Sequence, residues 1–230
     1  MQDQYLSVLA GTGLFADIGR TELEIMMNCM QPRICEFKKN DLITVAGDRF
    51  DSIGILLKGE AVVARDNAAG DRTIMNFLKP GDMFGEMVVF SRNSVWPATV
   101  IAQEACAVFF LAREKIVGEC GNVCSWHQTL IQNMLRIVSE RALALYKRVE
   151  YLSIRSMRGK LGTFLLEQYQ KAGREDFELP MNRNELAEFL NVSRPSMSRE
   201  LSRMRDEGII DFRLSRMRIK DLKALRDLAE

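Results

Sequence analysis

Short apolar runs separated by turn residues fill the first ~118 residues of the chain. Two such runs lie within Phe50–Ala64, on either side of the turn-forming Lys58-Gly59-Glu60. A polar loop is expected over residues 66–71. The other strand candidates are Thr73–Leu78, Thr99–Ile101 and Val108–Leu111. Strands this short, with turns about every 8–12 residues, predict a small sandwich, roll or barrel.

The segment before these strands has a different periodicity. Leu23, Met26, Met27 and Met30 recur at helical spacing. We therefore expect Gly13–Met30 to be helical.

A long helix is predicted in the middle of the chain, because Trp126–Leu152 contains neither Pro nor Gly. Its apolar positions follow spacings of 4, 3, 4, 3, 4 and 3. This a/d heptad seam favours a two-stranded parallel coiled coil, and hence a homodimer. The alternative is a single long core helix of a monomer. The seam residues are Ile131, Leu135, Val138, Ala142, Leu145, Val149 and Leu152.

The heptad register ends at Ser153–Ser156. Ser153 or Ser156 is suited to cap a new helix, expected over about Met157–Lys171 and ended by Gly173. We interpret Ser153 and Ser156 as a hinge. The chain then divides into a first domain of short strands (1–121), a dimerisation helix (122–152) and a third domain (153–230).

The third domain carries the most informative pattern. Asn182 and Glu185 form a capping pair for a short helix, and Asn191 suits a tight turn. Ser193 is suited to cap a second helix, with Pro195 allowed in its first turn. These features predict a helix-turn-helix. After Gly208, apolar residues alternate through Ile210–Ile219, which predicts a small β-wing.

Basic residues concentrate on the same segment. Residues 194–220 hold eight Lys and Arg against four acids, an excess of +4 within a chain of net charge +1. Such clustering suits binding to phosphates, and the first turns of the second helix are where a recognition helix meets bases. The predicted DNA-binding residues are Arg194, Ser196, Ser198, Arg199 and Arg203, among which Ser198 and Arg199 are the best candidates for base contacts.

Composition excludes several other classes of protein. The chain has 230 residues, 47% of them hydrophobic, and no apolar run approaches the ~20 residues of a membrane span. Its start lacks the features of a signal peptide, so we expect a soluble, cytoplasmic protein. Five cysteines, an odd number without a CxxC pair, argue against a disulfide framework. With one histidine and no P-loop, GxSxG or HExxH motif, neither an enzyme nor a His-rich metal site is expected.

Four segments, in this order, resemble the cyclic AMP receptor protein/fumarate-nitrate reduction regulator (CRP/FNR) family. FKKNDLITVAGDRFDSIGILLKGEAVV resembles its effector-binding β-roll, and FLKPGDMFGEMVVF its phosphate-binding cassette. The heptad helix resembles its dimerisation helix, and NVSRPSMSREL its recognition helix. The resemblance implies an α+β chain with a jelly-roll-like β-roll, a dimerisation helix and a winged helix-turn-helix.

The same resemblance implies a mechanism. A small effector is expected between the β-roll and the long helix, where it places two recognition helices about 34 Å apart on a palindromic operator. RNA polymerase is the implied downstream partner, and the implied role is that of an activator.

At the implied effector pocket, Gly85 and Glu86 match the family's Gly-Glu, whose glutamate contacts ribose in nucleotide-binding members. Where those members have an Arg-Ser pair for the cyclic phosphate, this chain has Trp96 and Pro97. Neither neutralises a phosphate, so we expect an effector other than cyclic AMP. The helix positions implied to complete the pocket are Arg141 and Tyr146. Trp96 and Tyr146 favour an aromatic or apolar ligand, with Trp96 as a plain core residue the alternative.

Other members of the same family suggest different inputs. The alternatives are thiol-redox or metal sensing by the cysteines, haem ligation by His127, and an activator that needs no effector. A regulatory subunit without DNA binding is disfavoured by the winged helix.

Many relatives have Glu at the position of Pro195. Because proline cannot accept a hydrogen bond from cytosine N4, the half-site should differ at that base pair.

Overall fold

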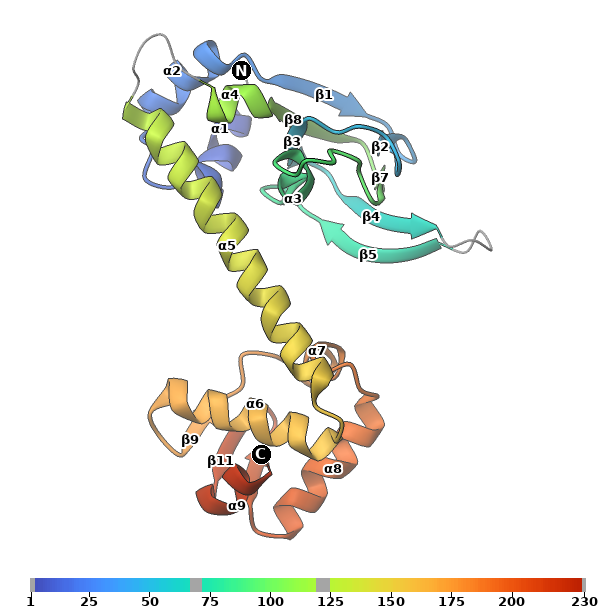
Figure 1. Ribbon diagram of the computed structural model, residues 1–230, viewed down its shortest axis with the longest axis vertical. Helices are drawn as coiled ribbons and strands as arrows, with labels where there is room; N and C mark the ends of the chain where they lie inside the picture. The colour runs from blue at the N-terminus through green and yellow to red at the C-terminus, as the bar shows by residue number, and fades with distance from the viewer. Residues whose placement is uncertain (1–2, 67–71, 119–124, 229–230) are drawn as a thin grey trace. The chain divides into compact units, whose positions relative to one another are not determined.

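The computed structural model describes residues 3–66, 72–118 and 125–228. The chain forms two compact units, divided between Glu140 and Arg141 (Figure 1). Helix α5 (Ser125–Ser153) contributes residues to both. The predicted three-part division stays a prediction, and its first boundary, at residue 121, lies outside the described residues.

Two antiparallel sheets build the N-terminal β-roll. Their strand orders are β1-β8-β3-β6 and β2-β7-β4-β5. β3 and β4 are consecutive yet belong to different sheets, so Gly59 turns the chain from one sheet to the other. Its φ is +81°, and a Cβ there would lie 2.6 Å from the carbonyl oxygen of Ala105, which explains the glycine. The strands are β1 (Arg33–Phe37), β2 (Leu42–Thr44), β3 (Ser52–Lys58), β4 (Ala61–Asp66), β5 (Arg72–Leu78), β6 (Met83–Phe84), β7 (Thr99–Ala102) and β8 (Cys106–Ala112).

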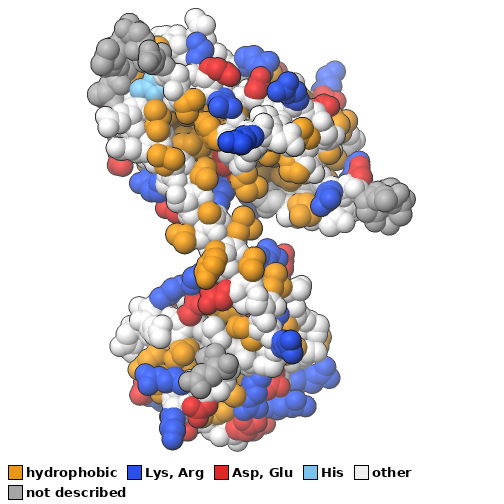
Figure 2. All heavy atoms as spheres, in the orientation of Figure 1, with side chains coloured by type: hydrophobic (Ala, Val, Ile, Leu, Met, Phe, Trp, Pro, Cys, Tyr) orange, Lys and Arg blue, Asp and Glu red, His pale blue; other side chains and the backbone are white. Residues whose placement is uncertain are grey.

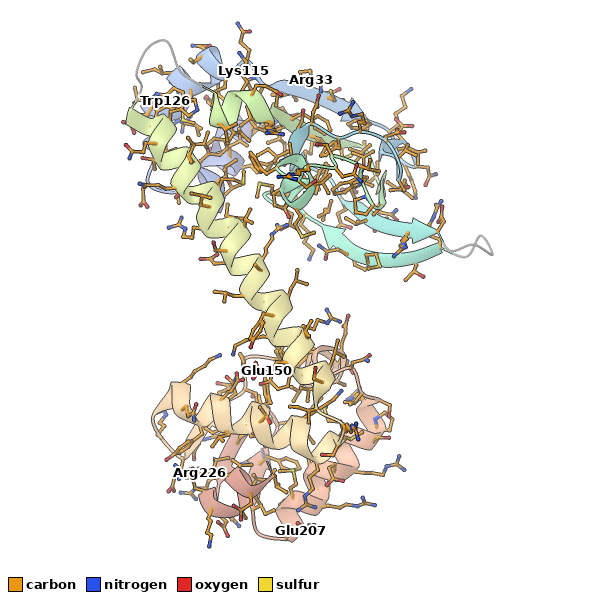
Figure 3. All side chains as sticks on the ribbon, in the orientation of Figure 1. Arg33, Lys115, Trp126, Glu150, Glu207 and Arg226 are labelled. Atoms are coloured by element: carbon orange, nitrogen blue, oxygen red, sulfur yellow. The ribbon has the colours of Figure 1, made fainter. Side chains whose placement is uncertain are left out.

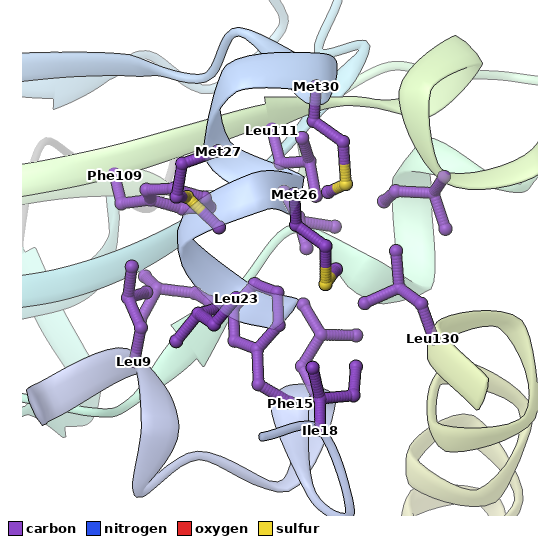
Figure 4. Packing of buried hydrophobic residues seen from close by; sticks show 14 of the residues in the cluster. Leu9, Phe15, Ile18, Leu23, Met26, Met27, Met30, Phe109, Leu111 and Leu130 are labelled. Atoms are coloured by element: carbon purple, nitrogen blue, oxygen red, sulfur yellow. The ribbon is translucent and has the colours of Figure 1, made fainter. Parts of the chain in front are cut away.

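Successive side chains of β3 point to opposite faces of the sheet and are buried in two different hydrophobic clusters. Ile53, Ile55 and Leu57 belong to a cluster shared with helices, whereas Leu56 belongs to a second cluster between the sheets. This is the period-2 alternation of a strand buried on both faces. Figure 4 shows the first cluster, in which residues of α2 and α5 meet those of β8. Its helices are α1 (Asp3–Ala10), α2 (Arg20–Met30), α4 (Arg113–Val117) and the first turns of α5.

The segment Gly13–Met30 is not one continuous helix as the periodicity indicates. A 3₁₀ turn over Gly13–Phe15 precedes α2, which begins only at Arg20. Asp17 between them has a φ of 62°, a left-handed conformation that interrupts a right-handed helix. The Glu22 carboxylate then accepts a hydrogen bond from the Gly19 amide at 2.9 Å and caps α2. The apolar spacing within α2 is confirmed, since Leu23, Met26, Met27 and Met30 are buried.

The first turns of α5 are fixed to the N-terminal unit. Trp126, Leu130 and Met134 are buried there. The Asn133 side chain donates to the carbonyls of Leu14 (3.0 Å) and Ala16 (2.7 Å). Val138 of the heptad seam also packs against this cluster of buried residues.

The C-terminal unit has a core of its own, to which the end of α5 contributes Tyr151. Helix α6 (Met157–Ala172) is capped by Ser156, whose hydroxyl accepts from the Gly159 amide at 2.8 Å, and it ends at Gly173. Both helix ends confirm the sequence interpretation. The remaining elements are β9 (Asp176–Glu178), α7 (Arg183–Phe189), α8 (Arg194–Asp206), β10 (Ile210–Arg213), β11 (Arg216–Ile219) and α9 (Leu222–Asp227), with sheet order β10-β11-β9.

Candidate nucleic-acid interface and effector cavity

The helix-turn-helix formed by α7 and α8 is confirmed at its caps. The Asn182 side chain accepts from the amides of Asn184 (2.9 Å) and Glu185 (3.1 Å), and the Glu185 carboxylate accepts from the Asn182 amide at 2.8 Å. Asn191 has a φ of 52°, the left-handed turn expected of it. Ser193 caps α8, with Pro195 in the first turn. Local capping therefore fixes the turn that sets α8 against α7.

Helix α8 has one buried and one exposed face. Met197, Leu201 and Met204 are buried in the core of the C-terminal unit. The other face carries the predicted DNA-binding residues: Arg194, Ser198, Arg199 and Arg203 are exposed and Ser196 is half-buried. Figure 2 shows Lys and Arg side chains gathered over this part of the C-terminal unit. The structure thus brings these five residues together on one surface, and their contact with DNA stays a prediction.

The acids of this segment are paired with neighbouring cations. Arg158 of α6 forms ion pairs with Glu200 (3.4 Å) and Glu207. The Arg158 hydrogen bond lowers the pKa of Glu207 below its usual value. Asp211 pairs with Lys220 at 3.8 Å. Glu200 also pairs with Arg203 at 3.4 Å, whereas no ion pair among the described residues involves Arg194 or Arg199, so these two arginines remain available to an anion.

One residue of this surface, Arg183, was not among the sequence candidates. Its guanidinium lies 4.9 Å from the ring centre of Phe212, and Arg205 lies 5.2 Å from the same centre. Burial lowers the pKa of Arg183, and its Nη1 has no hydrogen-bond partner among the described residues. Arg183 lines a groove of about 510 Å³ together with Arg194 and the wing residue Leu214. The only feature of the sequence that pointed to Arg183 was its position directly after the helix cap Asn182.

In the β-roll, Gly85 and Glu86 begin α3 (Glu86–Val89). Gly85 has a φ of +93°, and a Cβ there would lie 2.3 Å from the Phe50 ring, so only glycine fits. Glu86 is 1% exposed. Pro97 is exposed.

Trp96 is both a core residue and a cavity wall. It is 5% exposed, and its ring centre lies 5.3 Å from that of Phe50 and 6.2 Å from that of Phe84. It also lines a cavity of about 320 Å³ in the β-roll. Trp96 is thus a core residue that also lines this cavity, and its part in an effector pocket stays a prediction.

Arg141 and Tyr146 belong to the other unit, on α5. Arg141 is half-buried and Tyr146 is 69% exposed. Their part in an effector pocket stays a prediction.

The remaining sensor candidates have ordinary surroundings. The imidazole Nε2 of His127 hydrogen-bonds to the carbonyl of Ile116 at 2.8 Å, and its ring stacks on Trp126. Cys29 and Cys35 are half-buried, and burial raises the pKa of the Cys106 thiol. Cys120 and Cys124 lie outside the described residues. Across the part of the chain that the structure describes, no three His, Cys, Asp or Glu side chains form a metal-binding group.

No helix among the described residues is long and apolar enough to cross a lipid bilayer.

Comparisons with known proteins agree with both units. Residues 34–120 match the model of the cyclic nucleotide-binding domain, and residues 159–228 match the Crp-like helix-turn-helix domain. The chain is 20% identical over 221 residues to a cyclic AMP receptor protein of Thermus thermophilus, covering 96% of this chain and 98% of that protein. It is 23% identical over 217 residues to an anaerobic regulatory protein of Haemophilus influenzae, covering 92% of this chain and 81% of that protein.

Among solved structures, the catabolite activator protein of Thermus thermophilus has a similar fold. The TM-score is 0.53 at 20% identity, over 95% of this chain and 98% of that chain. With a β-roll of the cyclic nucleotide-binding type followed by a winged Crp-like helix-turn-helix, the chain belongs to the CRP/FNR family of transcription regulators.

Proposed function

We propose that this regulator acts as a homodimer that reads a palindromic operator with α8 and responds to a small effector other than cyclic AMP, bound by its β-roll domain. RNA polymerase is the proposed downstream partner. The observation that carries the proposal is the exposed face of α8, where Arg194, Arg199 and Arg203 lie together; Arg203 is paired with Glu200, and no ion pair among the described residues involves Arg194 or Arg199.

Arg199 is the residue proposed to read a base. It is exposed in the second turn of α8, and its guanidinium is steadied by a 3.2 Å hydrogen bond to the Ser196 hydroxyl. Arginine pairs well with guanine O6 and N7, and a good contact contributes about 1–3 kcal/mol of discrimination. Arg199 is therefore expected to set the preference at one position of each half-site.

The first experiment is operator selection from random duplex DNA, followed by fluorescence anisotropy. Arg199→Ala is expected to lose about 1–3 kcal/mol of specific binding and to accept other bases at one position. Arg92→Ala removes the same charge from an exposed site in the β-roll and serves as the control. Equal weakening of all sequences by Arg199→Ala would make Arg199 a phosphate contact only. Failure to bind any duplex at low salt would end the proposal.

Dimerisation is supported by the heptad seam of α5. Leu135, Leu145 and Val149 are 63%, 55% and 60% exposed, so the chain's own units leave them uncovered. A second copy presenting the same seam would bury them as coiled coils do.

An effector other than cyclic AMP is supported by Trp96. Where the family resemblance implies a phosphate-binding arginine, the structure has an indole packed among the rings of Phe50 and Phe84. Burying a phosphate beside these rings carries a large desolvation cost. Isothermal titration of the purified protein is expected to detect no cyclic AMP binding, and micromolar affinity would refute this part of the proposal.

A further inference from the structure

The wing ends in a tight turn, Leu214-Ser215, that joins β10 to β11. Arg213 and Arg216 lie directly opposite each other in the antiparallel register, so only these two residues form the turn. Leu214 has a φ of 56°. Short hairpin turns need this left-handed conformation, and Gly, Asn or Asp usually supplies it. A leucine at this position therefore strains the backbone.

The side chain of Leu214 is 85% exposed, the largest exposed fraction of any large hydrophobic side chain that the structure describes. Its backbone, in contrast, is held in place. The Leu214 carbonyl accepts a hydrogen bond from Arg183 Nη2 at 3.4 Å, and the Ser215 carbonyl accepts one from the Leu179 amide at 2.9 Å. Neither the turn nor the core requires a leucine here, so this strained and exposed side chain points to a partner outside the chain.

The groove beside Leu214 indicates where such a partner lies. Leu214 forms one wall of the groove of about 510 Å³ that Arg183 and Arg194, the first residue of α8, also line. A DNA strand with a phosphate between the two arginines would have α8 on one side and the tip of the wing on the other. Each backbone strand of a duplex separates the major groove from the minor groove. With α8 in the major groove, Leu214 would therefore lie at the minor groove.

The wing is fixed to α8, so a docked α8 also sets where the wing lies. The Ile209 amide, directly before β10, donates to the Met204 carbonyl of α8 at 3.0 Å. Arg205 of α8 lies 5.2 Å from the ring centre of Phe212 on β10. The end of α8, marked by Glu207 in Figure 3, is joined to α6 by an ion pair. The wing and α8 are therefore expected to approach DNA as one body.

The strands that carry the tip are basic. Arg213, Arg216 and Arg218 are exposed on them, and Arg216 is also paired with Asp176 at 2.6 Å. Cations suit the phosphates that border the minor groove, whereas a leucine side chain has no polar atom to offer them. Proteins that bind the minor groove insert apolar side chains of this kind between base steps and partly unstack them.

We infer that Leu214 enters the minor groove beside each half-site and partly unstacks one base step, so that the wing selects a flexible pyrimidine–purine step that α8 does not touch. Such steps, TA and CA, cost the least to deform. The inference rests on the proposed function, because it takes α8 to be the reader of the major groove. It adds a determinant of specificity that acts through the deformability of DNA instead of through base edges.

The first test is operator selection with random sequence extended beyond each half-site. The unaltered protein is expected to enrich TA or CA at one flanking position. On duplexes that differ only by TA or AA at that position, we expect it to bind the TA duplex about fivefold more tightly. Leu214→Gly keeps the turn and removes the side chain, so it is expected to bind both duplexes equally while keeping the base preference set by Arg199.

Two further variants separate the apolar side chain from the turn. Leu214→Met stays apolar and is expected to retain the preference for the TA duplex. Leu214→Asn suits the left-handed turn but is polar, and is expected to lose that preference. The fluorescence of 2-aminopurine, placed at each flanking adenine in turn, reports unstacking. It is expected to rise at one position with the unaltered protein and with Leu214→Met only.

The outcomes distinguish this inference from the function on which it rests. Base preference at the half-site without any flanking preference would overturn this inference alone. So would a flanking preference that Leu214→Gly and Leu214→Asn both retain, or 2-aminopurine fluorescence that rises at no position. Failure of the unaltered protein to bind any duplex at low salt would overturn both this inference and the proposed function.

Discussion

Arg183 illustrates how one side chain can be prepared for an anion. Its guanidinium rests on the Phe212 ring, and Nη2 reaches the Leu214 carbonyl at 3.4 Å, while Nη1 has no partner among the described residues. A guanidinium held on an aromatic ring keeps its charge and loses little freedom on binding. The groove it shares with Arg194 is therefore expected to receive a DNA phosphate.

Arg183→Gln is expected to weaken binding to all duplexes by a similar factor, because a phosphate contact carries no base information. It should also reduce the slope of log affinity against log salt by about 1, the value for one phosphate. Anisotropy titrations at several KCl concentrations, with the selected operator and a scrambled duplex, measure both effects. Arg92→Gln is the control for loss of charge. A loss confined to the operator would instead assign Arg183 to base readout.

Residues whose role depends on neighbours in sequence were predicted well. Asn182, Glu185 and Ser193 act within three residues of themselves, so their caps are visible in the sequence. Arg183 was missed because its partner, Phe212, follows far along the chain, on the wing.

At the scale of elements, a helix or strand could be predicted when its own sequence pattern was long and clear. The helix-turn-helix and the wing strands were predicted, whereas β9, with three residues, joins the wing only through pairing with β11. The break at Asp17 was missed because its left-handed conformation depends on its surroundings. Among the helices that pack on the β-roll, the sequence indicated α2 through the spacing of its apolar residues.

The joint between α5 and the N-terminal segment depends on Asn133. Its side-chain amide is buried and donates to the carbonyls of Leu14 and Ala16. Asn133→Ala removes both donors and is expected to lower the free energy of unfolding by about 1–3 kcal/mol. Urea denaturation followed by tryptophan fluorescence measures it, with the exposed neighbour Gln132→Ala as control. Equal stability of the two variants would show that water replaces the donors.

At the scale of the whole molecule, α5 has two distinct apolar regions. Near its start, Trp126, Leu130 and Met134 are covered by the chain itself. Further along, the heptad residues Leu145, Val149 and Leu152 are exposed. A contiguous apolar seam of this kind marks an interaction surface, and its heptad spacing matches a second copy of the same helix. In the proposed symmetric pair, each chain's recognition helix would read one half of a palindromic operator.

Leu145→Glu tests this pairing. A carboxylate in the seam would face its own copy across the two-fold axis, so we expect monomers at micromolar concentration. The helix itself should persist, because glutamate is a good helix former. Leu143→Glu makes the same change two residues away, outside the seam at a side chain that is 65% exposed, and is expected to leave the dimer intact. Sedimentation velocity measures the mass of each variant.

The same pair of variants links assembly to operator binding. A dimer engages its second half-site at high effective concentration, which typically strengthens binding by about 10²–10⁴-fold over one half-site. Leu145→Glu should lose affinity for the palindrome by a factor in this range and bind a single half-site like the unaltered protein. Leu143→Glu should retain both affinities. If Leu145→Glu stayed dimeric, or if its monomer bound the palindrome at full strength, the seam would have no role in reading the operator and the proposed architecture would be wrong.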